Sequence, residues 1–148
     1  MDKKIYLEKI GELLWSIMPR RAVQIGYQGQ IYGGFSQSNL FWIGKKGRVR
    51  SFGFDDFPED VAFEIEDTIA AMRDLPEFRH APFNQFEVTL EEKGRAQIRV
   101  ATIPEENSWV GLFLKGVSEL PLEAAREFGI SPEHWEACCT KFGVSQKI

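Results

Sequence analysis

The sequence predicts a single α+β domain spanning residues 1–148. An antiparallel sheet, a meander plus a hairpin, packs with an N-terminal helix, a central acidic helix and short C-terminal helices. Two observations lead to this fold class. Apolar residues recur at helical spacing near the start, middle and end of the chain, and short Gly-flanked runs and one alternating hairpin lie between them. The length is sufficient for one hydrophobic core.

The first third of the chain predicts a helix followed by a meander. Apolar residues at helical spacing extend over Lys3–Met18, and Pro19 ends the helix. The apolar and aromatic runs that follow are separated by Gly, Asn and Lys-Lys-Gly, which favours four short strands. These runs cover residues 23–27, 30–35, 40–43 and 49–54. The glycines among them lack nucleotide-loop spacing, so we interpret them as turns or bulges.

An acidic helix is predicted to begin near Asp56 and to end near Asp74. Asp56 is the expected N-cap, Pro58 lies in the first turn, and Glu59 follows the cap by three residues. A helical stripe from Val61 to Met72 forms its buried side. We interpret this segment as a helix with one apolar and one acidic face.

Residues 83–102 alternate apolar and polar side chains on both sides of Gly94, which predicts a hairpin. A three-residue loop ending at Gly94 sorts all apolar residues onto one face, whereas a two-residue loop does not. The preferred register places Glu87 opposite Arg99 and Glu91 opposite Arg95. Such cross-strand pairs of opposite charge stabilise a sheet face that meets water.

The C-terminal third predicts one strand and two short helices. The apolar run Ser108–Leu114 is interpreted as a strand, and a helix over Glu119–Phe128 ends at Gly129. A last helix begins at Ser131 and ends at Gly143. Its buried face is expected to carry the following side chains: Trp135, Cys138, Cys139 and Phe142.

The residues that could support catalysis show no catalytic spacing, so we expect no enzyme, no metal and no cofactor. Cys138 and Cys139 are adjacent, and with His134 and His80 they match no zinc pattern. A nucleophilic Cys–His pair normally comes from separate elements around a cleft, whereas His134 and Cys138 share one helix. The N-terminus is not a signal peptide and no run is long enough to span a bilayer. We therefore expect a cytoplasmic protein.

Charge is divided unevenly along the chain. Residues 1–54 carry nine Lys or Arg against three Asp or Glu, and residues 55–148 carry nine against nineteen. Seven acids lie between Asp55 and Asp67 with no base among them. They form either a solvated helix face or a surface that docks on a basic partner. The basic stretch Lys45–Arg50 is interpreted as a hairpin tip that protects a sheet edge rather than as a nucleic-acid site.

Three stretches resemble the YezG-like immunity proteins of bacterial polymorphic toxin systems. They are the helix that reaches a Met-Pro step in Leu13–Pro19, the acidic helix that closes with Ile69–Asp74, and the segment Pro82–Leu90 followed by Gly94 and a second strand. The resemblance implies an immunity protein that binds a cognate toxin domain and occludes its active site. A basic nuclease fits the acidic surface best. The C-terminal helices depart from this pattern.

The candidate partner-binding residues lie on the acidic helix and on the charged side of the hairpin. They are Asp55, Asp56, Glu59, Asp60, Glu64, Asp67, Glu87, Glu91, Arg95 and Arg99. A small acidic secretion chaperone that binds one effector is the alternative function. Neither nucleic acid nor membrane is an expected partner, and the protein is expected to be a monomer or a homodimer.

Overall fold

The α+β class is confirmed by the computed structural model, which describes residues 2–143. Within these residues the helices are α1 (Lys3–Ile17), α2 (Glu59–Arg73), α3 (Pro76–Arg79), α4 (Leu122–Glu127) and α5 (Pro132–Phe142). The strands are β1 (Ala22–Ile31), β2 (Ser36–Gly44), β3 (Val49–Ser51), β4 (Gln85–Glu91) and β5 (Ala96–Ala101). They form one antiparallel sheet in the order β3-β2-β1-β4-β5.

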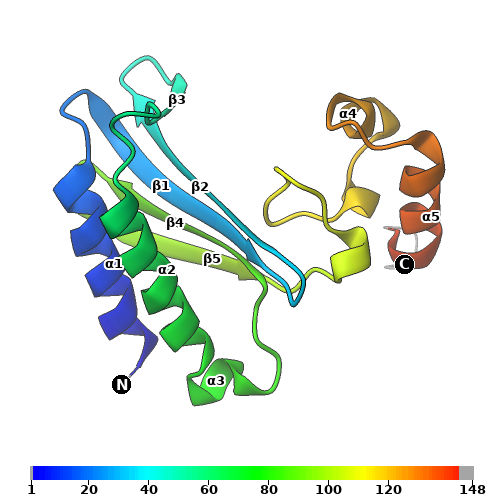
Figure 1. The fold of residues 1–148 in the computed structure, drawn as a ribbon, viewed down its shortest axis with the longest axis horizontal. Helices are drawn as coiled ribbons and strands as arrows, with labels where there is room; N and C mark the ends of the chain where they lie inside the picture. The colour runs from blue at the N-terminus through cyan, green and yellow to red at the C-terminus, as the bar shows by residue number, and fades with distance from the viewer. Residues whose placement is uncertain (1, 144–148) are drawn as a thin grey trace.

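Helices α1 and α2 lie side by side against one face of the sheet, as Figure 1 shows. The main hydrophobic core lies between these two layers, where the apolar stripe of each helix meets alternate residues of the central strands. Its fully buried members include Ile10, Leu14, Ile25, Ile65, Ile69 and Val88. No helix of residues 2–143 lies over the centre of the opposite face of the sheet (Figure 1).

Strand β1 is longer than the sequence suggested, and the predicted break between residues 27 and 30 is wrong. Gly26 and Gly29 lie inside the strand and pair with neighbours on both sides. Each provides room for an aromatic ring, because an added Cβ would lie 2.3 Å from Phe41 at Gly26 and 2.2 Å from Phe86 at Gly29. A glycine in a strand often marks such a close approach. Residues 30 and 31 of the second predicted strand therefore belong to β1, and residues 32–35 form the connection to β2 instead of a strand.

The hairpin prediction is confirmed in its register. Glu87 pairs with Arg99, Val88 with Ile98, and Leu90 with Ala96. Gly94 has a φ of 89°, the left-handed conformation that the three-residue loop requires. The apolar residues of β4 lie in the core, so the odd-numbered residues of that strand point to the uncovered face.

The predicted N-cap of the acidic helix is wrong by two residues, about half a turn. Pro58 is the N-cap, its carbonyl accepts from the Ala62 N–H at 3.0 Å, and no side chain caps the helix. The Asp56 carboxylate instead lies close to Gly53, where an added Cβ would be 2.7 Å from Asp56 Oδ1. Glu59 and Asp60 occupy the first turn, where their charge favours the helix dipole.

The C-terminal region forms a second, smaller hydrophobic cluster. Its buried members are Leu112, Val117, Leu120, Ala125, Ile130 and Cys138. The predicted strand over residues 108–114 is wrong, because this segment is a loop with a single bridge between Trp109 and Leu112. Helix α4 begins at Leu122 rather than Glu119, after a short 3-10 turn and Pro121.

The ends of these C-terminal helices agree with the predictions. Gly129 has a φ of 82° directly after the helix α4 cap, and Ser131 Oγ accepts from the His134 N–H at the start of α5. We call residues 104–143 the C-terminal lobe. Figure 1 shows the lobe beside the end of the β1–β2 hairpin, away from α1 and α2.

Candidate protein-binding site

The most prominent exposed surface combines acids with phenylalanines at the N-terminal end of α2. Phe54 is 99% exposed, Phe63 is 61% exposed and Phe57 is 41% exposed. The side chains around them are exposed carboxylates. We call this group the acidic aromatic surface, and it consists of Phe54, Asp55, Asp56, Phe57, Glu59, Asp60, Phe63, Glu64 and Asp67.

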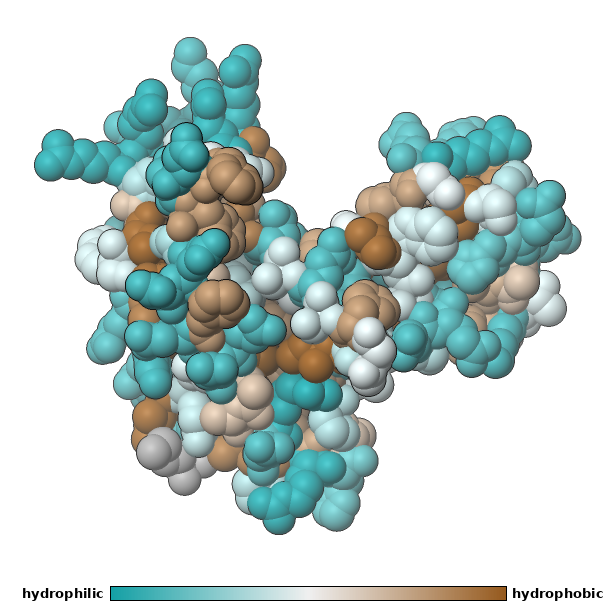
Figure 2. Space-filling view, in the orientation of Figure 1, coloured by the Kyte–Doolittle hydropathy of each residue, from teal (hydrophilic) through white to brown (hydrophobic). Residues whose placement is uncertain are grey.

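Helix geometry explains why these side chains point outward. Ala62, Ile65 and Ile69 face the core, and at 3.6 residues per turn Phe63 and Glu64 project away from it. The connection from β3 adds Phe54 and Phe57 beside the first turn of α2. A shallow hollow of about 510 Å³ lies there, lined by Phe54, Asp55 and residues 57–61. Figure 2 shows hydrophobic patches among hydrophilic side chains over this side of the molecule.

None of the acids of this surface forms an ion pair with a cation of residues 2–143. The ion pairs of the described chain join Lys3 to Glu77, Glu87 to Arg99, and Lys141 to Glu106. Unpaired carboxylates that lie close together produce a negative field, which attracts a basic partner and raises its association rate. Exposed aromatic rings of this kind are the side chains that most often dominate binding energy when a partner buries them.

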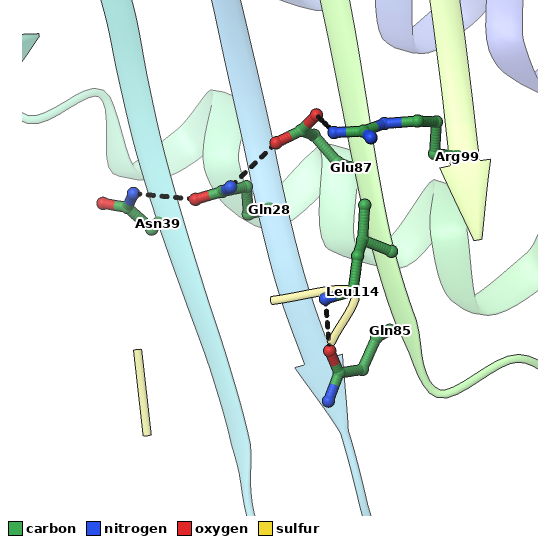
Figure 3. A network of polar contacts seen from close by, with 6 residues as sticks. All are labelled: Gln28, Asn39, Gln85, Glu87, Arg99 and Leu114. Carbon is green, nitrogen blue, oxygen red and sulfur yellow. Dashed lines mark hydrogen bonds and ion pairs between the residues drawn. The ribbon is translucent and has the colours of Figure 1, made fainter. Parts of the chain in front are cut away.

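The uncovered face of the sheet is also polar, but here the polar side chains bond to one another. Four of its side chains form one chain of hydrogen bonds across β2, β1, β4 and β5 (Figure 3). Asn39 donates to Gln28 at 3.1 Å, Gln28 donates to Glu87 at 2.8 Å, and Arg99 forms an ion pair with the other Glu87 oxygen. We call this surface the amide face, and it comprises Gln24, Gln28, Gln30, Gln37, Asn39, Gln85, Glu87, Gln97 and Arg99.

One end of the amide face is covered by the loop 109–114 of the C-terminal lobe. Gln30 is fully buried and donates to the carbonyls of Trp109 at 2.9 Å and Leu112 at 2.6 Å. Gln85 is also fully buried and accepts from the Leu114 N–H at 2.5 Å, as Figure 3 shows. These amides satisfy backbone groups that a loop would otherwise leave without partners. Figure 2 shows a broad hollow between the sheet region and the lobe.

The ten predicted site residues therefore lie on two separate surfaces. The six acids between Asp55 and Asp67 belong to the acidic aromatic surface, on the helix side of the sheet. Glu87 and Arg99 point from the opposite face and bond to each other. Glu91 and Arg95, which the sequence pairs by charge, are joined by a backbone hydrogen bond of 3.0 Å and by no ion pair in the described structure.

Two groups of residues at these surfaces escaped the sequence interpretation. The exposed phenylalanines could have been noticed, because Phe63 lies outside the apolar stripe of α2 and Phe54 and Phe57 flank two acids. The buried amides Gln30 and Gln85 carried no such indication. Their partners lie 29 to 82 residues away along the chain, so nothing local distinguishes them from surface glutamines.

Cys138 and His134 lie close together on helix α5. Cys138 Sγ lies 3.8 Å from His134 Nε2, one helical turn earlier. Burial, followed by the neighbouring Cys139 and Glu106, raises the pKa of the Cys138 thiol, which keeps it protonated and weakly nucleophilic at neutral pH. In the part of the chain that the structure describes, no group of three or more His, Cys, Asp or Glu side chains could hold a metal ion.

A scan against protein-family models finds no match, and a search of curated proteins finds no significant relative. Among the described helices, none is long and apolar enough to cross a membrane.

Proposed function

We propose that this protein is an immunity protein, which binds a cognate toxin domain in a stoichiometric complex and occludes its active site. The single observation that carries the proposal is the acidic aromatic surface. Three exposed phenylalanines lie among carboxylates that have no ion-pair partner among residues 2–143. The resemblance of Leu13–Pro19, Ile69–Asp74 and Pro82–Leu90 to YezG-like immunity proteins supports the same function.

The mechanism follows from how such surfaces bind. Phe54, Phe57 and Phe63 are the anchors, because aromatic side chains at the centre of an interface contribute most of the binding energy. The surrounding acids steer a basic partner and set the salt dependence of association. A nuclease presents clustered cations where it holds the phosphates of its substrate. The acids would occupy those cationic subsites and exclude nucleic acid from them.

A secretion chaperone is the second candidate, and one observation favours it. A hollow of about 500 Å³ lies between α1 and the β4–β5 hairpin, lined by Leu7, Gly11, Trp15, Leu90 and Ala96 among others. It lies beside β5, which is an edge strand of the sheet. An extended effector segment could add to that edge and place apolar side chains in the hollow, as in β-strand addition.

Co-expression with the protein encoded next to this chain's gene tests the proposal. For an immunity protein we expect cells to survive an otherwise lethal product and the two proteins to co-purify in equal amounts. The variant Phe54→Ser/Phe57→Ser/Phe63→Ser should lose both effects while remaining folded. The matched control Phe128→Ser/Val110→Ser changes exposed apolar residues of the C-terminal lobe and should retain them.

The opposite pattern favours the chaperone. In that case Trp15→Ser in the α1 hollow abolishes co-purification, the phenylalanine variant does not, and the partner is exported less efficiently without being toxic. Survival that is unchanged by the phenylalanine variant would contradict the proposed role of the acidic aromatic surface.

A further inference from the structure

A second charged site of opposite sign lies beside the acidic aromatic surface. Five cationic side chains from three segments surround a pocket of about 300 Å³. Arg21 comes from the α1–β1 connection, and Arg50 belongs to β3. The remaining cations come from the turn between β2 and β3. We call this the basic pocket, and its lining consists of Arg21, Trp42, Gly44, Lys45, Lys46, Arg48 and Arg50.

Among the described residues that line it there is no carboxylate, although Asp and Glu outnumber Lys and Arg in the sequence. None of the five cations forms an ion pair with an acid in the part of the chain that the structure describes. Arg50 instead lies over the Trp42 ring, 5.8 Å from its centroid. Cations held together without counter-charges repel one another, and a bound anion removes that repulsion.

The turn between β2 and β3 fixes the backbone from which three of these exposed cations project. Gly44 accepts from Gly47 at 2.9 Å and donates to the Arg48 carbonyl at 3.1 Å, and Gly47 has a φ of 82°. The tight turn thereby brings the backbone positions of its three cations close to one another. Protection of a sheet edge requires cations along the edge strand, but it does not require Arg21, which lies across the pocket from β3 on a different connection.

We propose that the basic pocket binds a compact, phosphate-bearing anion through its phosphate groups. Arginine forks bind phosphate oxygens in a bidentate manner, and lysines add point charge. A volume near 300 Å³ lies at the lower end of the range for ligand pockets, which is about 300–1,000 Å³. Trp42 packs against the main core and Arg50 lies over its ring, so the indole is not a platform for a stacked base.

A long nucleic-acid strand fits this site less well than a compact anion. Three residues lie between Arg50 and Phe54, where the acidic aromatic surface begins, and the four Cα-to-Cα steps between them span at most about 14 Å. A strand that leaves the pocket toward α2 meets the carboxylates of that surface and is repelled. A compact anion remains among the cations.

Titration calorimetry with inorganic tripolyphosphate at low salt tests the proposal. We expect one binding site, with affinity at least tenfold weaker in the variant Lys46→Ala/Arg48→Ala. The control Lys115→Ala/Arg126→Ala removes one exposed lysine and one exposed arginine from the C-terminal lobe, and its affinity should change less than twofold. Amide shifts in the NMR spectrum of the wild type should be confined to Arg21 and residues 44–50.

Three results would overturn the proposal. The first is the absence of binding to the wild type at low salt. The second is equal weakening in the two variants, which would indicate a delocalised field rather than a site. The third is tighter binding of a single-stranded thymidine oligonucleotide than of tripolyphosphate, with shifts that extend beyond the pocket. Thermal melts of each variant establish that the fold is retained.

Discussion

The acidic aromatic surface and the amide face are both rich in polar side chains, but they differ in whether those side chains have bonding partners within the protein. On the amide face, Asn39, Gln28, Glu87 and Arg99 bond to one another, and Gln30 and Gln85 bond to the loop 109–114 of the C-terminal lobe. On the acidic aromatic surface, the carboxylates have no ion pair within residues 2–143 and lie beside exposed phenylalanines.

This difference leads to separate expectations for the two surfaces. A charge that is paired within the protein contributes little long-range field, and its partner is already satisfied. Unpaired acids and exposed rings gain free energy only when a second molecule arrives. We therefore expect substitutions on the amide face to change stability, and substitutions on the acidic aromatic surface to change binding.

The largest expected effect is at the covered end of the amide face. Gln85→Ala removes the acceptor of the Leu114 N–H and the donor to the Tyr32 hydroxyl, and it leaves a cavity. Because these groups are shielded from water, we expect a loss of about 2–3 kcal/mol in the free energy of unfolding. Chemical denaturation measures this loss. A change below about 0.5 kcal/mol would show that the loop 109–114 is not held by these amides.

A smaller loss is expected in the open part of the amide face. Glu87→Ala removes the acceptor for both Gln28 and Arg99. The Arg99 side chain is largely exposed, so the loss should be about 1 kcal/mol. Glu87→Gln retains one acceptor and should recover part of it. If Glu87→Ala weakened partner binding without lowering stability, the amide face would be part of the binding site.

The stability of the C-terminal lobe is expected to depend on pH in the alkaline range, because Cys138 is buried in its hydrophobic cluster. Burial raises the pKa of Cys138 above its ordinary value near 9.0. Above that pH the unfolded thiol loses its proton while the folded thiol retains it, so stability falls as pH rises. Cys138→Ala should have a flatter dependence of melting temperature on pH between pH 8 and pH 10. Parallel curves for the two proteins would contradict this contribution.

The smallest effect on stability is expected on the acidic aromatic surface. Asp60→Asn and Glu64→Gln are exposed changes without a bonded side-chain partner, so unfolding free energy should change by no more than about 0.5 kcal/mol. Denaturation under the conditions used for Glu87→Ala makes the comparison direct. A loss of about 1 kcal/mol or more in the free energy of unfolding at either position would show that this side chain stabilises the fold.

The sequence predicted the parts of the fold that local pattern controls. The register of β4 and β5 follows from alternation around Gly94, because a slip by one residue would expose Val88 and Leu90. Local sequence pattern gave wrong predictions where contacts with residues distant in the chain determine the structure. In the sequence Gly26 resembles a turn residue. In the fold it lies inside β1, where its missing side chain leaves room for the Phe41 ring.

The site could be predicted only in part for the same reason. Seven acids without a base indicated the acidic surface, but local sequence could not show that Glu87 and Arg99 point from the opposite side of the sheet. Likewise, the apolar run at 108–114 resembles a strand, but its backbone groups are satisfied by Gln30, Gln37 and Gln85 rather than by a neighbouring strand. Only the assembled fold reveals these partners.

The most direct test of the central claim is the association rate with the co-purified partner at two salt concentrations. The variant Asp60→Lys/Glu64→Lys/Asp67→Lys reverses three acids of the acidic aromatic surface, and Glu123→Lys/Glu127→Lys/Glu136→Lys makes the same charge change on the C-terminal lobe. We expect association to slow by about tenfold or more, with a flatter salt dependence, only in the first variant. Equal rates and salt slopes for the two variants would contradict the claim that α2 carries the binding surface.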